Sequence, residues 1–137
     1  MNNGMEKLTV LILDDAAIIR TLTIALLRES TTTEAIVGTI LEAADIVSAM
    51  QLLAQHRPRI IILDIKVPGS ASLRNGIDVL KVVKASYPAT EVIMLTNHAT
   101  NHYRVECMRL GAAFFLDKSV EFDQLPVAVE ALALHTR

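Results

Sequence analysis

The chain has 137 residues, of which 52% are hydrophobic and 20% charged, and its formal net charge at pH 7 is −2. This length predicts one domain with a core of its own. The apolar runs are too short to cross a bilayer and the amino terminus has no signal-peptide pattern, so we expect no membrane partner. The small negative charge gives no reason to expect direct binding to nucleic acid. The single cysteine, Cys107, excludes an internal disulfide and suits a reducing compartment, so the expected location is cytoplasmic.

Strand-like and helix-like patterns alternate along the chain. Residues 1–6 are polar, lack periodicity and are expected to be disordered, whereas residues 7–137 are expected to form the domain. Residues 30–34 are rich in threonine and are expected to form a loop. The predicted strands are 8–13, 36–43, 59–63, 91–95 and 113–116, and the predicted helices are 16–28, 46–55, 75–86, 99–110 and a last one capped by Asp123.

Two of these helices have apolar patterns that make specific predictions. Helix 16–28 has one broad apolar face, formed by Ile18, Ile19, Leu22, Ala25 and Leu26. The last helix has two apolar stripes, one of Leu125, Ala128, Val129 and Leu132 and another of Val127, Ala131 and Leu134. Because one domain covers only the inner face of such a helix, we expect its outer face to dock a protein partner or a second copy. The alternative is an ordinary surface that happens to expose alanine and valine.

The alternation of elements also predicts the fold class. Short runs rich in β-branched residues, separated by amphipathic helices, indicate an α/β fold with a doubly wound parallel sheet of five strands and five helices covering both faces. In open sheets of this type, ligands bind beyond the carboxyl ends of the strands.

Four of the predicted strands are followed by side chains that suit phosphoryl chemistry. These residues are Asp14 and Asp15 after the first strand, Asp64 after the third, Thr96 after the fourth and Lys118 after the fifth. Each has an ordinary explanation by itself; Asp14 and Asp15, for example, could simply stabilise a helix amino terminus. The agreement of four strand ends favours a common site instead.

The chemistry expected of this group follows from its charges. Three carboxylates close together repel one another, so one of them takes up a proton unless a cation joins them. Mg²⁺ prefers hard oxygen ligands, which Asp14, Asp15 and Asp64 supply. With a cation bound, Asp64 can stay ionised and attack phosphorus. Lys118 can then contact a phosphoryl oxygen, and the Thr96 hydroxyl can donate a hydrogen bond to another.

These residues resemble a known family, the receiver domain of two-component response regulators, and in particular the stand-alone chemotaxis regulator. The resemblance covers about residues 7–134. It rests on the Asp-Asp pair after the first strand, on Asp64 within Leu-Asp-Ile-Lys-Val-Pro-Gly, on Thr96 within Met-Leu-Thr-Asn, and on Lys118 within Phe-Leu-Asp-Lys. The match at Pro68 adds to it. The resemblance implies a flavodoxin-like sheet with strand order 2-1-3-4-5.

The resemblance also implies a set of roles at the site. Asp64 accepts phosphate from a histidine kinase or a phosphotransfer protein. Asp15 and Asp64 bind Mg²⁺, or Mn²⁺ in its place, together with the backbone carbonyl of Lys66, and Asp14 helps through water.

Further implied roles concern the readout of phosphorylation. Thr96 and Lys118 contact the phosphoryl group, and Phe115 is the aromatic switch that turns inward as Thr96 moves. Output then passes to a protein target, or to a second copy, through the face formed by helix 99–110, strand 113–116 and the last helix.

The chain departs from the family pattern at two places. Residues 69–75 form a longer loop than is usual between Pro68 and Gly76, and this loop borders the site. Ser119 follows Lys118 where the family usually has a cis proline. Because a non-proline cis bond costs roughly 2.5–4 kcal/mol, we expect either a strained cis bond or a rearranged trans loop there.

The leading hypothesis is therefore a single-domain phosphoacceptor that catalyses only its own phosphorylation and dephosphorylation. One alternative is a receiver fragment of a larger DNA-binding transcription regulator. A second is a haloacid-dehalogenase-like phosphohydrolase, but its chemistry needs an acid two residues after the nucleophile, where this chain has Lys66. A third is a receiver-like module that binds partners without phosphate, which the complete set of acids, threonine and lysine disfavours.

Overall fold

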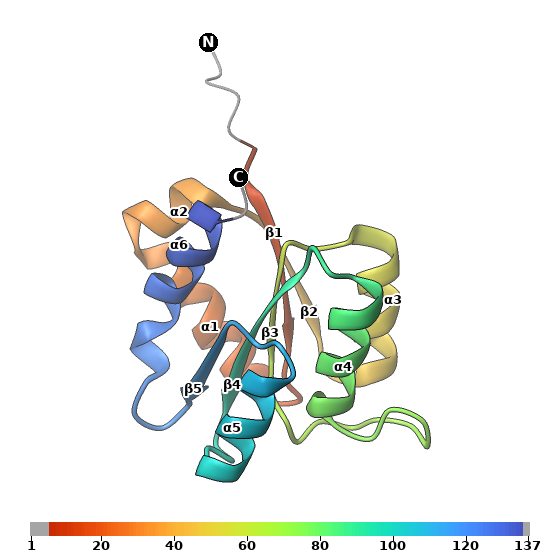
Figure 1. Cartoon of the computed structure of the whole chain (residues 1–137). Helices are drawn as coiled ribbons and strands as arrows, with labels where there is room; N and C mark the ends of the chain where they lie inside the picture. Colours follow the sequence, from red (N-terminus) through yellow and green to blue (C-terminus); the bar gives the residue numbers. More distant parts are fainter. Residues whose placement is uncertain (1–5, 136–137) are drawn as a thin grey trace.

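The fold is a five-stranded parallel sheet with helices on both faces (Figure 1). A computed structural model describes residues 6–135. The strand order is β2-β1-β3-β4-β5, so the predicted fold class and strand order are confirmed. The strands are β1 (Leu8–Leu13), β2 (Val37–Ala43), β3 (Ile60–Leu63), β4 (Glu91–Thr96) and β5 (Phe114–Asp117). The helices are α1 (Ala17–Glu29), α2 (Thr31–Ile36), α3 (Ile46–His56), α4 (Gly76–Ser86), α5 (Asn101–Arg109) and α6 (Leu125–His135).

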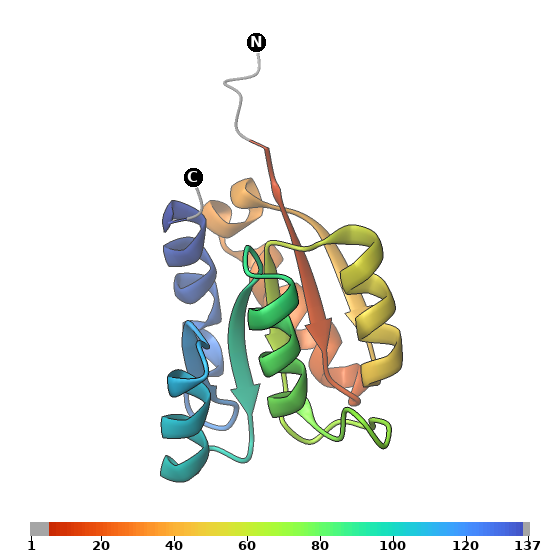
Figure 2. The same ribbon diagram turned by 45° about the vertical axis from the view of Figure 1, so that its right-hand side comes forward.

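The sheet separates two apolar cores, because successive side chains along a strand point to opposite faces. Ile61 and Leu63 of β3 pack in a core with α3, α4 and α5. Ile60 and Ile62 pack in the second core, with α1 and α6. All four side chains are buried, as expected of a central parallel strand covered on both sides. Figure 2 shows the two helical layers on either side of the strands.

The predicted loop at residues 30–34 is wrong, and with it the predicted number of helices. This stretch belongs to a short helix, α2, which brings the α-helices of residues 6–135 to six. Ser30 caps α2 by accepting a hydrogen bond from the backbone N–H of Thr33. The Thr33 side chain is fully buried and donates to Glu130 Oε2 of α6 over 2.8 Å. Tertiary contacts of this kind outweigh the low helix propensity of threonine.

The apolar face predicted for helix 16–28 is only partly the face that α1 buries, since Leu26 packs against the second core but the fully buried side chains are others. The buried residues of α1 are Thr23 and Leu27. Ile18 is 64% exposed and Leu22 is 46% exposed. Thr23 can face the core because its hydroxyl donates to the Ile19 carbonyl oxygen over 2.8 Å, which satisfies its polar group within the helix.

The last helix agrees with its predicted pattern except at its start. The stripe of Leu125, Ala128, Val129 and Leu132 is buried against the sheet. Val127 and Leu134 of the second stripe are 67% and 72% exposed. Asp123, the predicted cap, lies instead within a 3-10 turn, Phe122–Gln124, that precedes α6.

Other sequence predictions concern the chain ends and membranes. The predicted disordered segment, residues 1–6, lies outside the described residues except for Glu6. Within residues 6–135, no helix has both the length and the apolar character needed to span a membrane.

Candidate functional site

The carboxyl edge of the sheet holds a buried cluster of three charged side chains. Lys118 Nζ donates to Asp14 Oδ2 over 2.6 Å and to Asp64 Oδ2 over 2.8 Å. The exposed fractions of the three side chains are only 5 to 9%. Asp14 follows β1, Asp64 follows β3 and Lys118 follows β5. Residues up to 104 positions apart in sequence therefore share one site, because parallel strands end at the same edge.

Backbone hydrogen bonds fix the two carboxylates. Asp14 extends the ladder of β1 by donating its N–H to the Ala43 carbonyl, and its Oδ1 accepts from the N–H of Ala16 over 2.9 Å. Asp64 donates its N–H to the Leu13 carbonyl, and its Oδ1 accepts from the N–H of Ile65 over 2.7 Å. In each carboxylate, one oxygen is therefore held by the backbone and the other by Lys118.

The lysine responds to two opposing influences. Burial by itself lowers the pKa of Lys118, but its hydrogen bonds to Asp14 and Asp64 and the charges of both carboxylates outweigh burial, so the pKa is raised above its ordinary value of 10.5. Lys118 is therefore positively charged at neutral pH, and the formal charges of the two carboxylates and one ammonium sum to −1.

Thr96 lies beside this cluster, at the end of β4. Its side chain is fully buried, and its hydroxyl oxygen accepts a hydrogen bond from the backbone N–H of His98 over 3.0 Å. The Thr96 carbonyl accepts from the N–H of Lys118 over 2.9 Å, which ties the ends of β4 and β5 together. The threonine and the lysine predicted to read a phosphoryl group thus come from adjoining strand ends.

The other predicted metal ligands are the Asp15 carboxylate and the backbone carbonyl of Lys66, which lie just beyond β1 and β3. Asp15 is exposed, and the side chain of Lys66 is exposed beyond the end of β3. Among residues 6–135, no group of three His, Cys, Asp or Glu side chains is placed to hold a metal ion.

The residues nevertheless fit a hard divalent cation. A single ammonium group contacts both Asp14 and Asp64, so one cation can be shared by these two carboxylates. Carboxylate oxygens are the ligands that Mg²⁺ takes, and Asp15 adjoins the pair in sequence.

Two residues that support the site were not predicted. Gly76, the first residue of α4, lies so close to β3 that a Cβ atom would come within 2.0 Å of the Asp64 carbonyl oxygen. Arg20 donates from Nη1 to the Asp14 carbonyl over 2.8 Å and pairs with Glu42 over 3.1 Å. Both depend on contacts between separate elements, so periodicity could not reveal them.

A third residue, Asn75, could have been predicted from the sequence, because asparagine is a common helix cap. Its Oδ1 caps α4 by accepting hydrogen bonds from the N–H groups of Ile77 and Asp78.

The two departures from the family pattern have definite structures. The Lys118–Ser119 bond is trans, so the structure has the expected rearranged loop and not a strained cis bond. Asp117 organises this loop by accepting from the N–H and the hydroxyl of Ser119 over 2.9 and 2.6 Å. These bonds from Ser119 lower the pKa of Asp117.

The long loop, residues 69–75, is also ordered by its own contacts. Ser70 donates its N–H to the Leu73 carbonyl, and the Leu73 side chain packs on the core.

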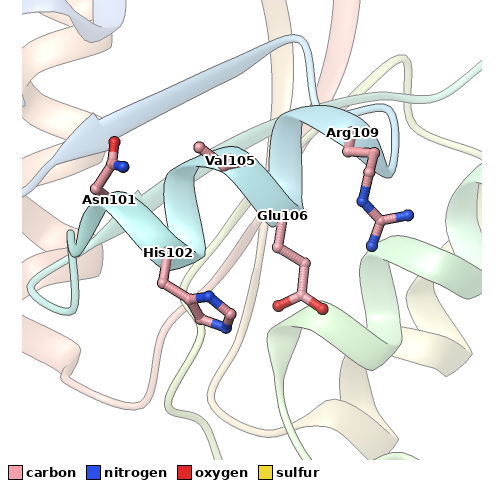
Figure 3. A pocket seen from close by; sticks show the side chains of 5 residues that line it. All are labelled: Asn101, His102, Val105, Glu106 and Arg109. Atoms are coloured by element: carbon pink, nitrogen blue, oxygen red, sulfur yellow. The ribbon is translucent and has the colours of Figure 1, made fainter.

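A shallow hollow on the surface of α5 lies outside this cluster. It is lined by Asn101, His102, Val105, Glu106 and Arg109, all on one helix (Figure 3). None of them belongs to the buried cluster at the carboxyl edge.

Comparisons with known proteins agree with the geometry. The model of the response regulator receiver domain family matches residues 10–130. An NtrX-like response regulator of Rickettsia bellii is 29% identical over 126 residues, which cover 92% of this chain and 25% of that protein. The regulatory protein LuxO of Vibrio vulnificus is 40% identical over 81 residues, which cover 59% of this chain and 17% of LuxO. The chain thus spans about a quarter or less of the length of these relatives.

A solved structure gives the same result for the fold. The response regulator domain of Thermotoga maritima CheB has a TM-score of 0.75 and 25% sequence identity, and the match covers 96% of this chain and 97% of that one.

Proposed function

The chain belongs to the family of response regulator receiver domains, and we propose that it is a two-component phosphoacceptor, phosphorylated on Asp64 by a histidine kinase or a phosphotransfer protein. The observation that carries this proposal is the buried ammonium of Lys118, held between the carboxylates of Asp14 and Asp64. We further propose that the protein acts in the cytoplasm.

In the proposed reaction the Asp64 carboxylate attacks phosphorus. A new bond forms between phosphorus and an Asp64 oxygen, and the bond from phosphorus to the histidine nitrogen of the donor breaks. Asp64 is suited to this role because the N–H of Ile65 holds its carboxylate at the carboxyl edge of the sheet, where the residue is 7% exposed. Lys118 already contacts an oxygen of Asp64, so its ammonium can move to an oxygen of the transferred group without leaving the site.

Receiver domains generally bind Mg²⁺ for phosphorylation. In this chain the proposed ligands are Asp14, Asp15, Asp64 and the backbone carbonyl of Lys66, and Mg²⁺ or Mn²⁺ held there would neutralise the oxygens of the transferred group. The exposed Asp15 is expected to turn toward Asp64 when the cation binds. Thr96 is expected to exchange its hydrogen bond with His98 for one to the phosphoryl group.

The proposed output surface is the face formed by α5, β5 and α6. Large apolar side chains are exposed on these elements and on the loop between β5 and α6: Val105, Met108, Val120, Val127 and Leu134. We propose that this face contacts a protein target or a second copy of the chain, and that Thr96 and Phe115 transmit the state of Asp64 to it.

A second candidate is that the chain is the receiver portion of a larger transcription regulator. The observation that favours it is that the chain spans about a quarter or less of the NtrX-like protein and of LuxO. The coding sequence downstream of Arg137 distinguishes the two candidates.

The test of the proposed function is phosphorylation by a small donor. The protein is incubated with acetyl phosphate and Mg²⁺, and its intact mass is measured. We expect the mass of one phosphoryl group to be added, Asp64→Asn to abolish the addition, and chelation of Mg²⁺ to prevent it. Asp123→Asn, the same change at an exposed position before α6, serves as the matched control and should be labelled normally. Undiminished labelling of Asp64→Asn would contradict the assignment.

A further inference from the structure

Arg104 of α5 makes three contacts that join the helix to β5 and to the loop beyond it. Its Nη1 donates to the Phe115 carbonyl over 2.8 Å. Its guanidinium carbon lies 4.8 Å from the centroid of the Phe115 ring, in the arrangement of a cation–π pair. Its Nη2 is 3.5 Å from Glu121 Oε1. One side chain therefore contacts the backbone and the ring of the same strand residue and an acid seventeen positions along the chain.

The acid that pairs with Arg104 is itself bound to the end of β5. Glu121 Oε1 accepts from the N–H of Asp117 over 2.8 Å, and the N–H of Glu121 donates to the Asp117 carbonyl over 2.7 Å. Lys118, the next residue, donates its own N–H to the Thr96 carbonyl. Arg104 is thus connected through Glu121 to the strand end that carries the lysine of the site.

The ring that Arg104 covers lies inside the protein, on the same face of the sheet as Thr96. Phe115 is 4% exposed and belongs to the core that includes Cys107 and Ala112. Met94 pairs with Phe115 and Thr96 pairs with Asp117 in the register of β4 and β5. Because side chains alternate along a strand, Thr96 and Phe115 point to the same side and are diagonal neighbours.

We propose that Arg104 is a positioning residue that holds the Phe115 ring inward before Asp64 is phosphorylated. This inference rests on the proposed function, together with the switch role that the family resemblance implies for Phe115, in which the ring turns inward on phosphorylation. Holding the ring inward in advance removes part of the cost of reaching that state. By thermodynamic linkage, loss of Arg104 must then weaken the binding of a phosphoryl analogue at Asp64, although Arg104 does not touch that residue.

The chain offers a matched set of variants for the test. Arg104→Gln removes the charge, and Arg104→Lys keeps the charge but loses the planar fork that reaches Phe115 and Glu121 together. Arg109→Gln is the control, because Arg109 lies on the same helix, is exposed, and lines the hollow of Figure 3.

The first measurement is the exposure of the Phe115 ring, read from the broadening of its proton NMR signals by a soluble gadolinium chelate without Mg²⁺. We expect a protected ring in the natural protein and in Arg109→Gln, and an accessible ring in Arg104→Gln. A ring that is equally protected in Arg104→Gln would overturn the proposal. If Arg104→Gln does not fold, Arg104→Lys gives the same comparison, with an intermediate accessibility expected and full protection contradicting the proposal.

The second measurement is the affinity for beryllofluoride in the presence of Mg²⁺. We expect Arg104→Gln to bind several-fold more weakly than the natural protein, Arg104→Lys to fall between them, and Arg109→Gln to be unchanged. Equal affinities of the natural protein and Arg104→Gln would contradict the coupling even if the ring is released. Failure of the natural protein itself to bind beryllofluoride or to be labelled on Asp64 would instead refute the proposed function, and the ring measurement would still decide whether Arg104 holds Phe115.

Discussion

The two ends of the sheet bury their polar groups in different ways. At the amino ends of the strands, buried hydroxyls have single, fixed acceptors: Thr90 donates to the Pro58 carbonyl over 2.6 Å, and Thr33 donates to Glu130 over 2.8 Å. At the carboxyl ends, Asp14 and Asp64 share the single ammonium of Lys118.

This difference indicates that the side chains at the carboxyl end of the sheet can exchange contacts when an ion or a phosphoryl group binds. A neutral hydroxyl that donates to one acceptor gains little from an added ion. Two buried carboxylates that share one positive charge keep an excess negative charge, so a cation is favoured there and the ammonium is free to exchange partners when a phosphoryl group arrives. Four predictions, taken from the largest expected effect to the smallest, test the contrast.

The close approach of α4 to the site gives the largest expected effect. In Gly76→Ala the new Cβ atom would lie 2.0 Å from the Asp64 carbonyl oxygen, so either the start of α4 or the end of β3 must shift. We expect the free energy of unfolding, measured with urea, to fall by about 3 kcal/mol or more. Gly38→Ala at the start of β2 is the control, since its new atom comes no nearer than 2.9 Å to a neighbouring atom, the Cβ of Lys7, and a smaller loss is expected than at the 2.0 Å approach of Gly76. Equal losses in the two variants would contradict a special constraint at Asp64.

The second-largest expected effect is the loss of stability when the ammonium of Lys118 is removed. Lys118→Met keeps the aliphatic stem but leaves Asp14 and Asp64 buried without a counter-charge, so we expect a loss of about 3 kcal/mol in the presence of a chelator. Added Mg²⁺ should restore part of this loss. Lys84→Met breaks a partly exposed pair with Glu91 at 3.9 Å and a hydrogen bond to the Thr90 carbonyl at 3.3 Å near the opposite end, and should cost about 1 kcal/mol with no response to Mg²⁺. Insensitivity of Lys118→Met to Mg²⁺ would count against a shared cation site.

Cys107 of α5 is a third case, an ionisable group buried in the apolar core between the sheet and its covering helices. Burial, followed by the charge of Glu106, raises the pKa of its thiol from 9.0 to about 11. Because the folded state holds the thiol proton more tightly, this contribution to stability is complete below pH 9 and is lost as the pH rises toward 11, by roughly 2 to 3 kcal/mol. Urea unfolding between pH 8 and pH 11 should therefore show a shallower alkaline loss for Cys107→Ala than for the natural protein. Parallel curves would show that the thiol does not contribute.

The smallest expected effect is at the amino ends of the strands, where each buried hydroxyl has one fixed acceptor. Thr33→Val keeps the shape of the side chain but removes the hydroxyl that donates to Glu130, and should cost about 1 kcal/mol. Labelling of Asp64 by acetyl phosphate should be unaffected, since the change lies at the other end of the sheet. A labelling rate that changes with this variant would mean that the two ends are not independent.

The sequence was sufficient to predict the sheet and the positions of its polar edge. Runs such as Ile60–Leu63 are too short and too continuously apolar for a surface helix, and parallel strands place the residues that follow them at one edge. For this reason the sequence alone predicts that Asp14, Asp64, Thr96 and Lys118 lie near one another.

The wrong predictions have two physical causes: a contact between distant segments forms α2, and a hydrogen bond within α1 lets a polar residue face the core. Helix α2 depends on the bond between Thr33 and Glu130, which lie 97 positions apart, and local propensity does not contain that bond. The buried face of α1 includes Thr23, whose hydroxyl is satisfied within the helix, whereas the more apolar Ile18 is exposed. The bridge from Arg104 to Phe115 likewise has no signal in either segment alone.

The most direct test of the account is a backbone amide NMR titration with beryllofluoride and Mg²⁺. The amides of Ile65, His98 and Lys118, which bond to Asp64 or Thr96, should show the large shifts. The amides of Thr33 and Thr90 at the opposite end should hardly move. Large shifts at Thr33 and Thr90 with none at Ile65 and Lys118 would contradict the assignment of the phosphoryl site to the carboxyl edge of the sheet.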